Sequence, residues 1–224
     1  MARPLDVVTT VITPAATHDL TDLATAKDEL KIPATDKTAD TFLARAITQS
    51  SSVIASFCNR IFPVEAVQDI LYLQRGVSSA RRGEDGELQL SRWPITAVTS
   101  VVETDASGND TTLAAGTDYM AIADTGRLLR LDASSGLPRR WRASSVTVNY
   151  SAGFNPIPAD VVDATLRLVA ARMNQRGRDP MIRSEGDTSG GNTQYWVGAM
   201  PGQNGSVSPE IAGLLQNYRQ PVAG

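Results

Sequence analysis

The sequence predicts an α+β protein: a small bundle of long antiparallel helices, an inserted and mostly antiparallel β-sheet region, and an extended C-terminal tail that ends in a short helix. Two observations support this prediction. Apolar residues recur every three or four positions in residues 38–59 and again in 159–177, which is the period of a helix with one buried face. Residues 62–151 instead contain short runs rich in Val, Ile and Thr, separated by turn residues.

The composition fits one large domain, or a domain with an elaborate insertion. The chain has 224 residues, of which 42% are hydrophobic and 5% aromatic, so we expect a core of Ala, Val, Leu and Ile. Its net charge of -3 argues against a chain that binds polyanions as a whole. The single cysteine, Cys58, excludes an intrachain disulfide. The N-terminus lacks the apolar core of a signal peptide and no segment approaches 18 apolar residues, so we expect a soluble, cytosolic protein.

The first elements are short. Residues 1–18 are predicted to form an N-terminal arm, and the run from Val7 to Ile12 is equally compatible with a short strand. Residues 21–31 have the spacing of a short amphipathic helix, which ends near Pro33 because the residue before a proline disfavours the helical region. Residues 19–60 are therefore interpreted as the first part of a helical body.

Two long helices are predicted to pack antiparallel. In residues 38–59 the apolar face includes Leu43, Ile47, Ile54 and Phe57, and in residues 159–177 it includes Val161, Leu168 and Val169. Asp160 favours the positive end of the second helix, and Gly177 is a common helix terminator. Residues 153–178 form the second part of the predicted helical body.

Residues 61–152 form the predicted β insertion. The predicted strands are 64–73, a strand that begins at Leu88, 95–104, 119–122, 128–131 and 145–151. Gly153 permits a tight exit from the last strand, and Pro156 and Pro158 then keep the backbone extended up to the start of the second long helix.

The C-terminal region has two parts. Residues 179–207 are rich in glycine and predicted to be flexible, with Tyr195 and Trp196 as a compact apolar anchor. Residues 208–224 are predicted to form a docking helix, because Ser208, Pro209 and Glu210 make a typical helix start. Its apolar stripe consists of Ile211, Leu214, Leu215 and Tyr218. A helix of about a dozen residues is marginal alone in water, so we expect it to lie on another surface.

No enzymatic motif is found. The lone His18 is interpreted as a solvated loop residue, and one Cys with one His cannot build the usual zinc sites. The chain contains no nucleophile elbow, Walker loop or dinucleotide fingerprint. Glu84, Asp85 and Glu87 are interpreted as an acidic turn, with a carboxylate-bound metal and a hydrolase as a weaker alternative. We therefore expect no catalytic residue, no cofactor-binding residue and no metal ligand, and a protein that is not an enzyme.

Arginines gather in three clusters. They are Arg81–Arg82, the segment Arg139–Arg140–Trp141–Arg142, and the arginines between Arg172 and Arg183. The alternative function is a nucleic-acid-binding module that uses residues 139–142 and 172–183, with Trp141 stacking on a base. Because the overall charge is acidic, we favour surface or subunit-contact arginines over binding driven by many phosphate contacts.

Several segments match a known family. They are residues 20–32, the segment Cys58-Asn-Arg-Ile-Phe-Pro63, and Tyr150-Ser-Ala-Gly-Phe154 followed by Pro158, Val161 or Val162, and Ala164. With them the chain resembles the head-tail connector (adaptor, or head-completion) proteins of long-tailed bacteriophages and gene transfer agents. The resemblance covers residues 20–62 and 145–178, while the β insertion and the glycine-rich tail match only in placement.

The resemblance implies a structural virion protein at the head-tail interface, assembled in the host cytoplasm. It implies a homo-oligomeric ring, commonly a dodecamer, that binds the portal protein and a stopper or tail-side protein. DNA would pass through the ring without sequence-specific binding, with no membrane and no cofactor involved. On this chain, ring-body packing is assigned to Leu43, Ile47, Ile54, Phe57, Val161, Leu168 and Val169. Portal docking is assigned to Tyr195, Trp196, Ile211, Leu214, Leu215 and Tyr218.

Overall fold

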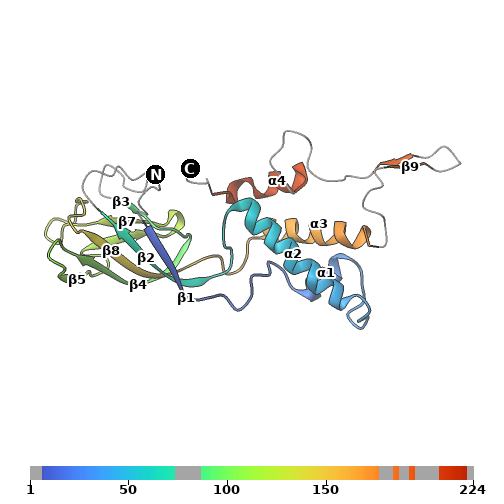
Figure 1. Cartoon of the computed structure of the whole chain (residues 1–224), viewed down its shortest axis with the longest axis horizontal. Coiled ribbons are helices and arrows are strands. Elements are labelled where there is room, and N and C mark those ends of the chain that lie inside the picture. The colour runs from blue at the N-terminus through green and yellow to red at the C-terminus, as the bar shows by residue number, and fades with distance from the viewer. Residues whose placement is uncertain (1–6, 74–86, 177–183, 187–191, 195–206, 221–224) are drawn as a thin grey trace. The chain divides into compact units, whose positions relative to one another are not determined.

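The computed structural model describes residues 7–73, 87–176, 184–186, 192–194 and 207–220. The chain divides into two compact units, each built from segments far apart in the sequence (Figure 1). The β unit comprises Met1–Ala16 and Pro63–Asn155, and the helical unit comprises Thr17–Phe62 and Pro156–Gly224.

The β unit contains two antiparallel sheets. The five-stranded sheet has the order β1 (Val7–Thr13), β2 (Glu65–Tyr72), β8 (Ser145–Ala152), β4 (Ile95–Thr104) and β5 (Asp110–Thr112). The three-stranded sheet has the order β3 (Glu87–Gln89), β7 (Arg127–Arg130) and β6 (Tyr119–Ile122), with a 3-10 turn at Ala123–Thr125 between β6 and β7. The strands predicted near residues 64–73, 95–104, 119–122, 128–131 and 145–151 are confirmed.

One apolar core joins both sheets. In β8 the buried positions alternate with half-buried ones, and Val146, Val148 and Tyr150 point into the core. Leu88 and Leu128 reach the same core from the three-stranded sheet. This alternation is the expected pattern of a strand with one face buried.

The helical unit contains four α-helices in the described residues. They are α1 (Leu23–Glu29), α2 (Asp40–Cys58), α3 (Ala159–Asn174) and α4 (Pro209–Leu215), the last followed by a 3-10 turn at Gln216–Tyr218. The Asp22 carboxylate caps α1 by accepting a hydrogen bond from the Thr25 amide at 2.7 Å. The Ser208 hydroxyl oxygen caps α4 by accepting from the Ile211 amide at 3.4 Å, as its helix-start motif predicted.

The helices α2 and α3 pack side by side, and α1 contacts both. Leu43 and Ile47 of α2 share a buried cluster with Val169 of α3 and Ala26 of α1. The C-terminal half of α3 therefore lies against the N-terminal half of α2, so the two helices run in opposite directions.

Two further short strands, β9 (Ser184–Gly186) and β10 (Asn192–Gln194), pair antiparallel. None of the helices in the described ranges is long and apolar enough to span a membrane.

The predicted fold class is wrong. Helix and strand contents are about equal, and α1 and α4 have only seven residues each, so the described chain is not a bundle of long helices with an insertion. In the described part of the β unit, eight strands form the two sheets. One of them, β1, precedes all the described helices. β1 pairs with β2, for example Val7 with Leu71. Because its partner lies so far along the chain, no local hairpin signal could have placed it in the sheet.

Candidate functional site

The exit from β8 is held by a close backbone contact within the β unit. Gly153 has a φ of 139°, and its amide donates to the Pro94 carbonyl at 2.9 Å. A Cβ at this position would lie 2.5 Å from the Pro63 carbonyl oxygen, so a side chain cannot be accommodated without a shift. The predicted tight exit at Gly153 is confirmed, and the close contact with Pro63 explains why it needs glycine.

A buried carboxylate organises the five-stranded sheet. Asp69 of β2 is fully buried and accepts hydrogen bonds from the Tyr150 hydroxyl at 2.8 Å and the Ser91 amide at 2.7 Å. It also accepts from the hydroxyls of Ser91 at 2.8 Å and Thr9 at 2.7 Å. Burial, together with the Asp69 charge, raises the pKa of Tyr150. The network links β1, β2, β8 and the segment after β3, and we interpret it as structural.

The strand β1 is an exposed edge. Val8, Val11 and Ile12 are all exposed large apolar side chains, and the strand contains no charged residue. It is held to the sheet by its ladder with β2, by the Thr9 bond to Asp69 and by a bond from the Ala15 amide to Glu65 at 3.2 Å. Uncharged edge strands are ready templates for pairing with another chain, so this edge is a candidate contact surface.

The C-terminal helix packs on its own unit. Ile211 and Leu215 are buried, and Leu215 is fully inaccessible to solvent. The helix contacts α3, and Arg167 of α3 forms an ion pair with Glu210. The surface that this helix was expected to need is supplied, for Ile211 and Leu215, by its own chain.

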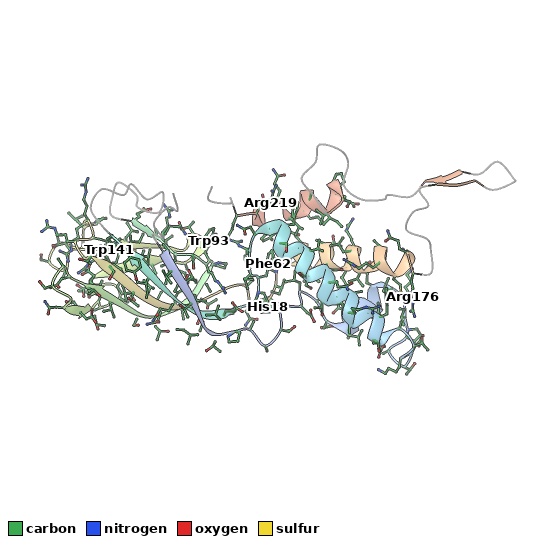
Figure 2. All side chains as sticks on the ribbon, in the orientation of Figure 1. His18, Phe62, Trp93, Trp141, Arg176 and Arg219 are labelled. Atoms are coloured by element: carbon green, nitrogen blue, oxygen red, sulfur yellow. The ribbon has the colours of Figure 1, made fainter. Side chains whose placement is uncertain are left out.

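The residues after α4 continue this packing. The rings of Tyr218 and Phe62 lie 6.0 Å apart, and the Arg219 guanidinium lies 4.8 Å from the centre of the Phe57 ring (Figure 2). The Gln220 amide donates to the Cys58 carbonyl at 2.9 Å. These contacts attach residues 218–220 to the C-terminal end of α2.

The six portal-docking candidates thus fall into three groups. Ile211 and Leu215 are buried within the helical unit, while Leu214 and Tyr218 are half-buried and keep part of their surface accessible. Tyr195 and Trp196 lie outside the described residues. Of the four described candidates, only Leu214 and Tyr218 keep accessible surface while α4 stays in place.

The ring-body candidates pack against each other and their neighbours inside one chain. Six of them are buried, and Phe57 is half-buried under Arg219; the six are Leu43, Ile47, Ile54, Val161, Leu168 and Val169. They belong to α2 and α3, whose side-by-side packing holds the helical unit together. While the helical unit stays folded, the buried side chains of these residues are occupied by packing within their own chain.

The segment 139–142 does not form a stacking surface. Arg139, Arg140 and Arg142 are exposed, but Trp141 is buried in the core of the β unit. The guanidinium of Arg130 lies 6.0 Å from the centre of the Trp141 ring. Because Trp141 cannot reach a base, the nucleic-acid alternative loses its aromatic residue.

A different arginine cluster is present on the helical unit. Arg45 and Arg176 lie on the Phe42 ring, with guanidinium carbons 5.8 and 5.0 Å from its centre. Arg172 donates to the Gln49 side chain at 3.1 Å. Arg172 and the arginines after it were predicted as a cluster from the sequence, but Phe42 and Arg45 were not. Their three-residue spacing on α2 was the available signal.

No metal centre is found among the described residues. Glu84 and Asp85 lie outside them, and Glu87 forms an ion pair with Arg127 at 2.8 Å. In the described ranges no group of three or more His, Cys, Asp or Glu residues is placed to hold a metal ion. Burial raises the pKa of the Cys58 thiol to about 11, which keeps it protonated and unreactive near neutral pH.

Comparison with known proteins identifies similar structures but no family. No protein-family model matches the sequence, and no curated protein matches it. One similar solved chain comes from the neck of an empty GTA particle computed with C6 symmetry; it is 19% identical, with a TM-score of 0.54, over 97% of this chain and 98% of that chain. Another comes from the virion of a native gene transfer agent (GTA) particle; it is 20% identical, with a TM-score of 0.53, over 96% of this chain and 98% of that chain. Over nearly its whole length, the chain therefore shares its fold with proteins of gene transfer agent particles.

Proposed function

We propose that this protein is a structural head-tail adaptor. It forms a ring under the portal of a phage-like particle, continues the DNA channel and joins the head to the stopper or tail. The observation that supports this most is the full-length likeness to a chain of a particle neck, which spans 97% of this chain and 98% of that one. That likeness includes the β unit, where the sequence resemblance matched only in placement.

The ring is proposed to be cyclic and built from this chain alone. The neck that contains the similar chain was computed with C6 symmetry, and a dodecamer, as the sequence resemblance implies, is compatible with a sixfold axis. Such a role needs complementary surfaces and no reacting groups, so we propose that the protein is not an enzyme.

We assign portal binding to the C-terminal region. Ile211 and Leu215 anchor α4 on its own unit, so the helix is already formed when a partner arrives. A preformed helix loses less conformational freedom on binding than one that folds on its partner. The portal contact is then made by the accessible parts of Leu214 and Tyr218 together with Tyr195 and Trp196.

The test is reconstitution of the full-length chain with purified portal assemblies, followed by electron microscopy. We expect rings of this chain that share the portal axis and contact one face of the portal. A chain that stays monomeric, both alone and with the portal over a wide range of concentrations, would overturn the proposal.

A further inference from the structure

The seam between α2 and α3 has a concentrated positive charge. We call Phe42, Arg45, Arg172 and Arg176 the arginine cluster; Arg45 and Arg176 are exposed and Arg172 is half-buried. The Phe42 ring supports two of the guanidinium groups and Gln49 the third. A guanidinium that lies on an aromatic ring is oriented but keeps N–H groups free to bind a carboxylate.

These arginines differ from others in the structure. Arg167 on α3 pairs with Asp163 and Glu210, and in the β unit Arg130 pairs with Glu103 at 3.0 Å. Within the part of the chain that the structure describes, Arg45, Arg172 and Arg176 form no ion pair. Their charges are therefore held in place, and no carboxylate of a described residue neutralises them.

Phe42 packs against the buried cluster that α2 and α3 share with α1, but Arg45 points away from it. On α2, Leu43 faces the buried cluster shared with α1, and Arg45 follows two residues later, roughly 200° further round the helix. On α3, Val169 packs into that same cluster, while Arg172 reaches Gln49 of α2. Figure 2 shows Arg176 at one end of the helical unit and Phe62 and Arg219 at the other.

The surface of α1 carries the opposite charge. Asp22, Asp28 and Glu29 are exposed, whereas Lys27 is buried in an ion pair with Asp40 and does not neutralise that surface. The hydrogen bond from the Thr25 amide lowers the pKa of Asp22, which keeps this carboxylate charged. In the described ranges neither Asp28 nor Glu29 forms an ion pair, and the exposed Lys31 lies beyond the end of the helix.

Two copies cannot pair through the arginine cluster itself, because like charges repel each other. A contact that uses the cluster must therefore join it to a different patch on the next copy, and such heterologous contacts are the kind that close into rings. The helical unit offers a complementary patch on α1. We infer that, in the ring proposed above, the arginine cluster of one copy binds Asp22, Asp28 and Glu29 of the next copy.

This inference rests on the proposed function, since it concerns the contact between neighbours in that ring. Surface charge pairs fix orientation and speed association more than they add affinity. Apolar contacts elsewhere, with the β1 edge as a candidate, contribute to the affinity of the same ring.

The test exchanges charges in the full-length chain and measures self-association by sedimentation. The cluster variant is Arg45→Glu with Arg176→Glu, and the acid variant is Asp28→Arg with Glu29→Arg. Each alone is expected to weaken ring formation roughly tenfold or more, because like charges then meet at every contact. Mixed in equal amounts, the two variants are expected to form rings again, with alternating copies.

The mixture also controls for misfolding, since damaged chains would not assemble on mixing. Arg139→Glu with Arg140→Glu, on exposed residues of the β unit, makes the same change in net charge and is expected to leave the rings intact. If the unaltered chain forms no ring either alone or with the portal, the proposed function fails. If it forms rings and both variants do so equally well, only this inference fails. Intact rings that lose binding to duplex DNA in the cluster variant would overturn it in favour of a DNA contact.

Discussion

Gly153 shows how one residue controls the path from β8 toward α3. Its φ of 139° is rare for other residues, and an added Cβ would meet the Pro63 carbonyl carbon at 2.6 Å as well as its oxygen. We predict that Gly153→Ala lowers the free energy of unfolding of the β unit by about 3 kcal/mol or more, from backbone strain plus the clash. Urea denaturation followed by tryptophan fluorescence measures this.

Gly108→Ala is the matched control for that prediction. Gly108 also has a positive φ, of 86°, but a Cβ there would meet nothing within 4 Å. Its substitution should cost only about 1 kcal/mol, the conformational part alone. Equal losses in the two variants would show that the contact with Pro63 is not what restricts residue 153.

Two buried groups, the Cys58 thiol and the Tyr150 hydroxyl, predict that the protein loses stability at alkaline pH. Burial raises the pKa of Cys58 from 9.0 to about 11, and burial with the Asp69 charge raises that of Tyr150 above its ordinary value of 10.0. In each case the folded chain keeps a proton that the unfolded chain releases, so stability is complete below the ordinary pKa and falls as pH rises above it.

The expected result is a falling free energy of unfolding above pH ~9, with a slope of at most about 1.4 kcal/mol per pH unit for each group. Cys58→Ala should remove the loss that begins near pH ~9 in the helical unit, and Tyr150→Phe should reduce the slope above pH ~10 in the β unit. Urea titrations at several pH values measure the slopes. A slope unchanged in both variants would contradict this account.

At the scale of the element, α4 shows what an amphipathic stripe does and does not specify. The spacing of Ile211, Leu214 and Leu215 correctly predicts a helix with an apolar face, and Ser208 correctly marks its start. The same spacing cannot tell which surface receives that face. That depends on the apolar surface left open on α3 and at the end of α2, which only folding assembles.

We predict that Leu215→Ala destabilises the helical unit by about 2–4 kcal/mol, because it removes a fully buried side chain. Leu214→Ala, one residue earlier and half-buried, should cost clearly less. Hydrogen exchange of the α4 amides together with urea denaturation measures both. A larger loss for Leu214→Ala would mean that α4 presents its other side to the unit.

A helix-stabilising variant gives the converse test. Gly213 lies within α4, and a Cβ there would meet nothing within 4 Å, so Gly213→Ala should slow exchange of the helix amides. The expected gain is up to about 1 kcal/mol, from the higher helix propensity of alanine. Faster exchange in this variant would contradict the packing described.

At the scale of the whole molecule, the proposed roles separate between regions. If ring contacts use the arginine cluster and α1, and portal contacts use the C-terminal region, each can be lost without the other. We predict that Tyr195→Ala combined with Trp196→Ala leaves ring formation intact but weakens portal binding at least tenfold, because aromatic anchors dominate many interfaces. Sedimentation measures the first and co-sedimentation with portal assemblies the second. Normal portal binding by this variant would show that neither residue contributes to the portal contact.

The assembly of the strands into two sheets also depends on the whole chain. Most strands of the β unit were recognisable locally, since their Val-rich and Thr-rich runs are bounded by turns. Their assembly into two sheets on one core was not. β1 in particular joins β2 through pairs such as Val11 with Val67, and the buried Asp69 then ties it in place through Thr9. Instead of the predicted helical body with a β insertion, the chain has a β unit and a helical unit, with about equal contents of strand and helix.

The sequence by itself determined that helices lie near residues 21–31, 38–59, 159–177 and 208–218, where the longer strands between residues 64 and 151 lie, and that Gly153 makes a tight turn, but it did not predict β5, β9 or β10. These features depend on residues near each other in the chain, through periodicity, caps and allowed backbone angles. Only the tertiary structure decided that β1 completes a sheet, that Ile211 and Leu215 are buried in their own unit, and that Phe42 gathers arginines from two helices. Those outcomes depend on which distant surfaces meet, and that is set by packing of the whole chain rather than by any local pattern.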